Sequence, residues 1–216
     1  MMGIFGNIFG RKSGRKSSGA KRDDTRITIH RRLRDVTIVK GAPMSFEEAN
    51  RGHCNPYYWM GRGHKSNCQA CIAACIARLR GFRVRAQAFS MRKTAMVKLS
   101  KDTSLAYLTD NGLHPNQVRM RGEDYLSNLN KVMNDGDVFS VQFLKIRKRS
   151  GHICIAMKER GDVFLYDPQK GTVMRSVCDI DGYMRNADKN TIQIMNLTHV
   201  SIDTNFCGDI FKKAKR

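Results

Sequence analysis

The sequence lacks long apolar runs, has few acidic residues and shows no internal repeat. No stretch approaches the roughly 18–20 consecutive apolar residues of a membrane-spanning helix, which argues against a transmembrane segment. We expect no signal peptide, because the apolar start from Met1 to Gly10 is short and Arg11 and Lys12 follow it rather than precede it. Without a repeat, solenoids and repeat arrays are excluded.

Acidic residues are scarce beside basic ones. The chain has 19 Asp+Glu against 39 Lys+Arg, which gives a formal net charge of +20. A field of this strength attracts polyanions such as nucleic acid, acidic proteins or anionic lipid, although charge alone gives no specificity. Both a polyanion-binding surface and a merely solvated basic surface are consistent with it.

The cysteines do not look like a disulfide framework. There are seven, an odd number, and four of them lie between positions 54 and 75. Without a secretion signal this pattern favours reduced thiols. One of them could be catalytic and several could bind metal, while most are expected to be small core residues.

The length of 216 residues suits one domain with tails. Residues 1–25 are predicted to be a basic flexible tail, because Gly, Ser, Lys and Arg dominate them without an apolar period. The folded domain is expected over 26–205. Residues 206–216 are expected to be a basic C-terminal tail.

The pattern along the chain predicts an α+β fold. The clearest element is a helix from Cys68 to Arg80, with Asn67 as its N-cap and Gly81 closing it. Other predicted elements are one or two strands in 25–39, strands near 82–87 and 95–99, a helix over 123–133, strands over 138–146, 152–158 and 163–166, a helix over 178–187 and a last strand over 191–202. A helix thus precedes a mostly antiparallel sheet.

Cys68 is the first candidate for chemistry. It occupies the first position of the predicted helix, where unpaired backbone N–H groups carry partial positive charge. A thiol at such a place has a lowered pKa, and the same N–H groups can stabilise an oxyanion. The alternative interpretation is a small buried residue that opens a helix.

A base and an orienting acid follow later in the chain. His152 heads a hydrophobic strand after Gly151, and Asp167 ends the next strand. If the two strands form a hairpin, both side chains lie at the same end of the sheet, within reach of each other. A nucleophile, a base and an orienting acid form the set that thiol hydrolases use. Taken singly, His152 could be a surface histidine and Asp167 a turn aspartate.

Several segments in order resemble a known family. They are Cys54-Asn-Pro-Tyr-Tyr, Ser66-Asn-Cys-Gln-Ala-Cys and Ala77-Arg-Leu-Arg-Gly-Phe-Arg-Val-Arg-Ala, then Gly151-His152 and Asp167-Pro-Gln169-Lys-Gly171. Together they resemble the papain-fold toxin family, whose toxin glutamine deamidase domains occur in bacterial polymorphic toxins and phage head-associated proteins. The similarity covers roughly residues 50 to 175 and leaves 1–45 and 176–216 unexplained.

The resemblance implies a papain-like catalytic domain in which the N-terminal catalytic helix packs on a mostly antiparallel sheet. It implies a triad of Cys68 as nucleophile, His152 as base and Asp167 as orienter, with Gln169 in support. Asn67 or the N–H of Cys68 would serve the oxyanion. The reaction would convert a glutamine of a protein substrate to glutamate through a thioester, without cofactor or metal. The protein would be cytoplasmic, or carried in a phage virion and delivered to a bacterial host.

Three alternatives stay open. Cys68 and Cys71 have zinc-like spacing, and His53, Cys54 or His64 could complete a site, although the second CxxC pair is missing. The charge and the basic tails also suit a non-enzymatic virion protein that binds nucleic acid or another polyanion. A cysteine protease would use the same triad and the same thioester chemistry.

Overall fold

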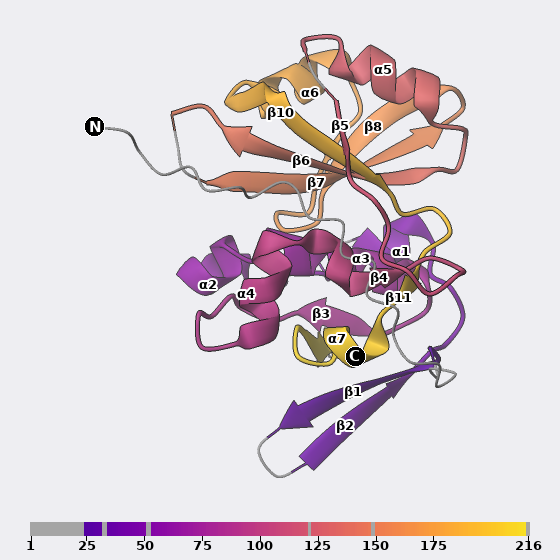
Figure 1. The fold of residues 1–216 in the computed structure, drawn as a ribbon, viewed down its shortest axis with the longest axis vertical. Coiled ribbons are helices and arrows are strands. Elements are labelled where there is room, and N and C mark those ends of the chain that lie inside the picture. Colours follow the sequence, from indigo (N-terminus) through magenta and orange to yellow (C-terminus); the bar gives the residue numbers. More distant parts are fainter. Residues whose placement is uncertain (1–23, 32–33, 51–52, 121, 148–149, 215–216) are drawn as a thin grey trace.

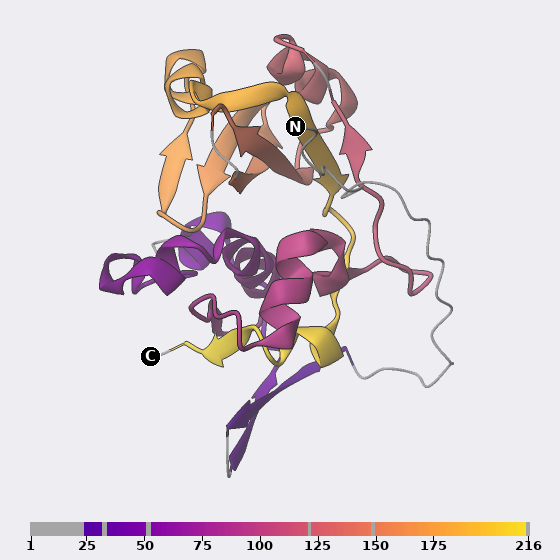
Figure 2. The ribbon, with the colours of Figure 1, turned by 60° about the vertical axis from the view of Figure 1, so that its left-hand side comes forward.

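The fold is described here from a computed structural model over residues 24–31, 34–50, 53–120, 122–147 and 150–214. Figures 1 and 2 show two layers, a sheet with its own helices above and a helical layer below, with a hairpin projecting beneath. The predicted tail over 1–25 lies outside the described residues except for its last two positions.

The upper layer is built on an antiparallel sheet. Within the described residues it has six strands in the order β5-β10-β6-β7-β8-β9. These are β5 (Val118–Arg119), β10 (Ala187–Asn196), β6 (Val138–Lys145), β7 (Gly151–Glu159), β8 (Asp162–Asp167) and β9 (Thr172–Met174). Every neighbouring pair is antiparallel, so the β7–β8 hairpin that the sequence predicts is confirmed.

Both faces of the sheet are covered. Helices α5 (Tyr125–Val132) and α6 (Val177–Met184) lie on one face and α3 (Cys68–Leu79) lies on the other (Figure 1). In β7, Ile153 and Ile155 join the core around α3, whereas Cys154 and Ala156 join the core beneath α5 and α6. A strand buried on both faces reads as a continuous apolar run, which is why this stretch has no polar residue.

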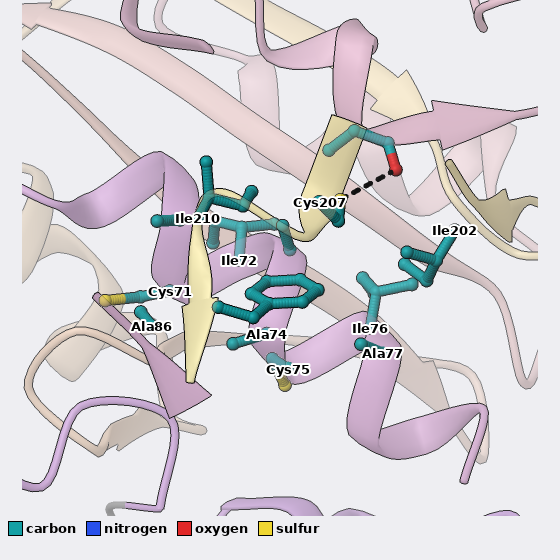
Figure 3. Packing of buried hydrophobic residues seen from close by; sticks show 14 of the residues in the cluster. Cys71, Ile72, Ala74, Cys75, Ile76, Ala77, Ala86, Ile202, Cys207 and Ile210 are labelled. Atoms are coloured by element: carbon teal, nitrogen blue, oxygen red, sulfur yellow. Dashed lines mark hydrogen bonds between the residues drawn. The ribbon is translucent and has the colours of Figure 1, made fainter. Parts of the chain in front are cut away.

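Helix α3 is the centre of the lower layer. Nearly all of its residues are buried, and its Ala and Cys side chains let neighbouring elements approach closely. Figure 3 shows three residues of this helix, Cys71, Ile72 and Ile76, beside three residues from other parts of the chain, which are Ala86, Ile210 and Ile202. The predicted helix is therefore confirmed, and its burial fixes the position of its first residue, Cys68.

Gly81 ends α3 as predicted, and its backbone shows why. Its φ of 99° lies in the left-handed region, and a Cβ there would sit 2.3 Å from the carbonyl oxygen of Gly41. No side chain fits at this position. The buried Arg78 holds the same corner, because its guanidinium donates to the carbonyl oxygens of Glu48, Ala49 and Val84.

Short elements surround α3. They are α1 (Phe46–Asn50), the 3₁₀ turn η1 (Tyr58–Met60), α2 (Arg62–Lys65), β3 (Val84–Ala86), α4 (Thr94–Lys101), the 3₁₀ turn η2 (Thr103–Ala106) and the paired strands β4 (Tyr107–Leu108) and β11 (Ser201–Ile202). The strand predicted near 95–99 is wrong, because this segment lies in α4. Its buried residues Met96 and Leu99 are spaced three apart, as on one face of a helix.

The segments on either side of the central domain belong to the lower layer. Strands β1 (Arg26–Arg31) and β2 (Arg34–Val39) pair as a hairpin whose apolar face packs beside α7 (Thr204–Cys207). The predicted C-terminal tail over 206–216 is in large part folded. β12 (Phe211–Lys213) pairs with β3, and Cys207, Ile210 and Phe211 are fully buried.

The α+β class predicted from the sequence is confirmed by the mixture of helices and an antiparallel sheet. Among the helices of the described residues, none combines the length and the apolar character needed to cross a bilayer.

Candidate active site

Cys68 lies at the junction of the two layers. It is the first residue of α3 and its side chain is 7% exposed. Its Sγ is 3.3 Å from Oε1 of Gln69, and the thiol lies close enough to His152 to raise the pKa of that imidazole. The thiol is therefore at the helix start, as predicted, and in contact with an imidazole rather than enclosed by apolar neighbours.

His152 approaches this thiol from the start of β7. Its Nε2 donates to Oδ2 of Asp167 at 2.9 Å, which leaves Nδ1 as the ring nitrogen available to the thiol. The ring makes an edge-on contact with Phe143 and a tilted contact with Tyr183, at centroid distances of 5.9 and 6.1 Å. Only 8% of the residue is exposed, so its orientation is set by packing as well as by the carboxylate.

Asp167 is fully buried at the end of β8, yet both of its oxygens have partners. Oδ1 accepts from the backbone N–H groups of Gln169 and Lys170 at 2.9 and 3.2 Å. Oδ2 accepts from His152 and from the hydroxyl of Tyr183, both at 2.9 Å. The turn after β8 thus holds the carboxylate on one side, and α6 holds it on the other.

The charges of this pair depend on each other. Burial lowers the pKa of His152, but its hydrogen bonds with Asp167 and Cys68 outweigh burial and raise the pKa to about 9. Burial raises the pKa of Asp167, but His152, Tyr183 and the turn amides bring it below its ordinary value. At neutral pH the site therefore holds an imidazolium beside a carboxylate, the arrangement that stabilises a thiolate.

Asn67 and Gln169 lie beside Cys68, His152 and Asp167. The sequence predicts that the side chain of Asn67 caps α3, and this prediction is wrong. Asn67 occupies the N-cap position of α3 without capping it through its side chain. The side chain is used elsewhere, because its Nδ2 donates to the carbonyl oxygen of Gln87 at 2.9 Å and its Oδ1 is 3.3 Å from Sγ of Cys71.

Gln169 takes the place that Asn67 leaves at the helix start. In one orientation of its amide, Nε2 donates to Oδ1 of Asn67 at 3.1 Å. In the other, Oε1 accepts from the backbone N–H groups of Asn67 and Cys68, each at 3.1 Å. The second orientation caps the helix from a segment a hundred residues away, which local sequence rules do not detect.

The cysteines form no disulfide. All seven are free thiols, and burial raises the pKa of Cys71, Cys154 and Cys207 above the ordinary value. Within the described ranges, which include His53, Cys54, His64, Cys68 and Cys71, no group of three or more His, Cys, Asp or Glu side chains is arranged to hold a metal ion. The zinc interpretation therefore gains no support.

Sequence analysis missed three residues of the site. Tyr183 is one, because an aromatic residue on an amphipathic helix looks like a core residue. Asn55 is the second. Its Nδ2 donates to the carbonyl oxygens of His64 and Gln169, at 2.8 and 3.0 Å, and its carbonyl lies near the amide of Asn67. The third, Gln87, connects Asn67 to the C-terminal segment by donating to the carbonyl oxygen of Phe211.

The segment that contains Cys68, His152 and Asp167 matches a known protein family. Residues 66–172 match the family model described as papain fold toxin 1, glutamine deamidase. This segment of the chain belongs to that family. The resemblance stated from the sequence is thereby confirmed, and the matched segment of the papain fold toxin 1 family contains Cys68, His152 and Asp167.

The match also has boundaries. Tyr183 and the whole of α6 lie beyond the segment matched to the papain fold toxin 1 family, and so do η1 and α2. No curated protein matches the chain. The contacts of Tyr183 and of the residues before Ser66 are therefore known from the structure of this chain and not from the family match.

Proposed function

We propose that the protein is a thiol amidohydrolase that deamidates a glutamine side chain of a protein substrate. Membership in the papain fold toxin 1 family supports a glutamine deamidase of the toxin type. The observation that carries the proposal is the row of Cys68, His152 and Asp167, in which His152 is hydrogen-bonded to Asp167 at 2.9 Å and interacts with the thiol of Cys68. A nucleophile, a base and an orienter in contact are what acyl transfer at an amide requires.

In the first half of the reaction, the thiolate of Cys68 attacks the side-chain carbonyl carbon of the glutamine. The C–N bond then breaks, and the imidazolium of His152 gives its proton to the leaving nitrogen, which departs as ammonia. A thioester between Cys68 and the substrate side chain remains. The raised pKa of His152 suits this step, because the ring carries the needed proton at neutral pH.

In the second half, His152 is neutral and takes a proton from a water molecule that attacks the thioester carbon. The C–S bond breaks, a glutamate side chain leaves, and the proton returns the site to its thiolate and imidazolium state. Asp167 stays ionised throughout, since its partners lower its pKa. It orients the ring and stabilises its charge.

The oxyanion would be served by the backbone N–H of Cys68, at the positive end of α3. The side chain of Asn67 is not its donor, because it is engaged with Gln87 and Cys71. In one amide orientation Oε1 of Gln169 accepts from this N–H, and a substrate carbonyl would have to displace it there.

The test compares two single cysteine variants. Purified protein and the Cys68→Ala and Cys178→Ala variants are incubated with glutamine-containing proteins, and ammonia and the conversion of Gln to Glu are followed by mass spectrometry. We expect Cys68→Ala to abolish turnover, and Cys178→Ala to keep it, because Cys178 is exposed and outside the site. Peptide fragments instead of deamidated product would identify a protease. Equal turnover by all three proteins would refute the assignment of Cys68.

A further inference from the structure

The part of the chain that supplies the nucleophile carries charge of one sign. From residue 51 to residue 101 the sequence contains no Asp or Glu, although it contains many Lys and Arg. This stretch includes η1, α2, α3, β3 and α4, and hence most of the layer below the sheet. Asp167, the acidic side chain of the candidate site, comes from elsewhere in the chain. The charged side chains that this stretch itself contributes next to Cys68 are therefore all basic.

Within this stretch, two neighbouring segments expose large apolar side chains beside basic ones. The segments touch, because the N–H of Phe89 donates to the carbonyl oxygen of Gly63 at 2.8 Å, and a Cβ on Gly63 would lie 3.0 Å from the carbonyl oxygen of Phe89. The exposed side chains, which we call the rim, are Trp59, Met60, Arg62, Lys65, Met91 and Arg92.

The exposure of the apolar members is unusual for their type. Trp59 and Met91 are each 74% exposed, and Met60 is 58% exposed. Aromatic, Met and Arg side chains are enriched where proteins bind one another, whereas large apolar side chains in a surface with no partner are normally scattered singly. Their grouping with three exposed basic residues gives this surface both an apolar and an electrostatic means of binding.

The rim is tied to the candidate active site. Lys65 precedes Cys68 by three residues, and Asn55 bridges the two sides by donating to the carbonyl oxygens of His64 and Gln169. Gln169 belongs to the turn that follows β8, and the same turn carries the exposed Lys170. Burial, then the positive charges of Arg85 and Lys212, lower the pKa of His64, so cationic groups also gather behind α2.

We propose that the rim is the docking surface for the protein substrate, and that the target glutamine lies in an acidic segment with a neighbouring apolar side chain. This inference rests on the proposed deamidase function, from which it takes the protein nature of the substrate. Carboxylates would pair with Arg62, Lys65 and Arg92, while the apolar side chain would pack on Trp59 and Met60. Charge complementarity of this kind selects partners and speeds their association.

Binding can be measured apart from activity, because Trp59 is the single tryptophan of the chain. The Cys68→Ala protein is titrated with tryptophan-free peptides that share a central Gln and one Leu, flanked either by Asp and Glu or by Ser. We expect the acidic peptide to change the Trp59 fluorescence and to bind about five- to tenfold more tightly, as expected for a few exposed ion pairs. Added salt should remove this difference.

The matched variants are Arg62→Glu and Lys131→Glu, which change the net charge equally. Lys131 is exposed on α5, in the other layer of the molecule. Arg62→Glu should abolish the preference for the acidic peptide, and Lys131→Glu should keep most of it. Equal affinity for both peptides, or equal effects of the two variants, would overturn the proposal. So would a nucleic-acid oligonucleotide that binds more tightly than the acidic peptide and loses its affinity in Arg62→Glu.

The same peptides separate this inference from the function on which it rests. In the active protein, ammonia release should be faster from the acidic peptide and slower in Arg62→Glu. If neither peptide is deamidated but the fluorescence preference holds, the deamidase assignment fails and the rim remains a binding surface for acidic polypeptides. If both peptides are deamidated at the same rate and bind equally, the function stands and the docking surface is refuted.

Discussion

At the scale of single residues, the site depends on how many hydrogen-bond donors the carboxylate of Asp167 has and where they come from. Asp167 accepts from His152 and Tyr183 at the same oxygen, Oδ2, and from two turn amides at the other. Tyr183 acts on the site through its hydrogen bond to Asp167 and its packing against the ring of His152, so it is a positioning residue. Burial is the main reason why its own pKa is raised, and the hydroxyl therefore remains a donor to Asp167.

Replacing Tyr183 by Phe should change both the pKa of His152 and the stability of the protein. Without the hydroxyl, the charge on Oδ2 is directed at His152 alone, so we expect the pKa of His152 to rise above its present value of about 9. Loss of a hydrogen bond to a charged group should also cost about 1.5–3 kcal/mol of stability. The imidazole titration is followed by NMR and stability by urea unfolding.

Tyr125→Phe is the matched control for this change. Tyr125 is buried on α5, over the same face of the sheet, and its hydroxyl has no hydrogen-bond partner. We expect its removal to leave the titration of His152 unchanged and the stability unchanged or higher. If Tyr183→Phe also leaves the titration of His152 where it is, the hydroxyl contributes only to packing.

At the scale of elements, the C-terminal strand β12 is where sequence and structure differ most. Its Phe211 is fully buried and pairs with Ala86 of β3, and its carbonyl accepts from Gln87, which in turn accepts from Asn67 beside Cys68. Phe211→Ala should therefore cost about 3–5 kcal/mol, whereas the exposed Lys213→Ala in the same strand should cost less than about 0.5 kcal/mol. Urea unfolding measures both. Equal, small effects would mean that this segment is a tail after all.

Two elements could be predicted from the sequence, helix α3 and the β7–β8 hairpin. Their apolar residues follow a regular pattern over a long segment, and Gly81, Gly151 and Pro168 mark their ends. These two elements were enough to bring Cys68, His152 and Asp167 together. The short segment 95–99 was assigned wrongly because so few residues do not distinguish a strand from one helical turn.

Other differences arose from contacts between segments far apart in sequence. The run Lys212-Lys213 suggested a tail, but Ile210 and Phe211 before it fill space against α3 and β3. Asn67 suggested a cap by local rules, but its side chain is used by Gln87 and Cys71, and Gln169 reaches the helix start instead. Tyr183 gave no signal at all, because only the fold places α6 over Asp167.

At the scale of the whole molecule, the buried ion pair of His152 and Asp167 lies beside the boundary between the two layers, inside a chain of net charge +20. The upper layer supplies His152 and Asp167, and the lower one supplies Cys68. Surface positive charges repel one another and are screened by salt, but a buried pair is screened much less. The pair should therefore govern how the stability of the protein responds to pH in its middle range.

The sign of this response follows from the two shifts. The pKa of His152 is raised from 6.5 to about 9, so its contribution is complete below pH 6.5 and is lost as the pH rises through 9. The pKa of Asp167 is lowered from 3.8, so its contribution is present above pH 3.8 and is lost as the pH falls through the lowered value. Both are present together between about pH 4 and 6.5.

Asp167→Asn should remove the contribution of Asp167 and the part of the His152 contribution that comes from Asp167 rather than from Cys68. We expect the loss of unfolding free energy to be largest between about pH 4 and 6.5, with at most about 3 kcal/mol from the shift of His152, and to shrink as the pH approaches 9. Asp35→Asn is the control, because Asp35 contacts His30 at the same 2.9 Å on the exposed β1–β2 hairpin. Since exposed pairs contribute little, its effect should be small at every pH. Urea unfolding of the parent protein and both variants at a series of pH values measures these losses. A loss in Asp167→Asn that is the same at pH 5 and pH 9 would mean that the carboxylate supports the fold through its neutral hydrogen bonds alone, and that His152 carries no proton in the resting site.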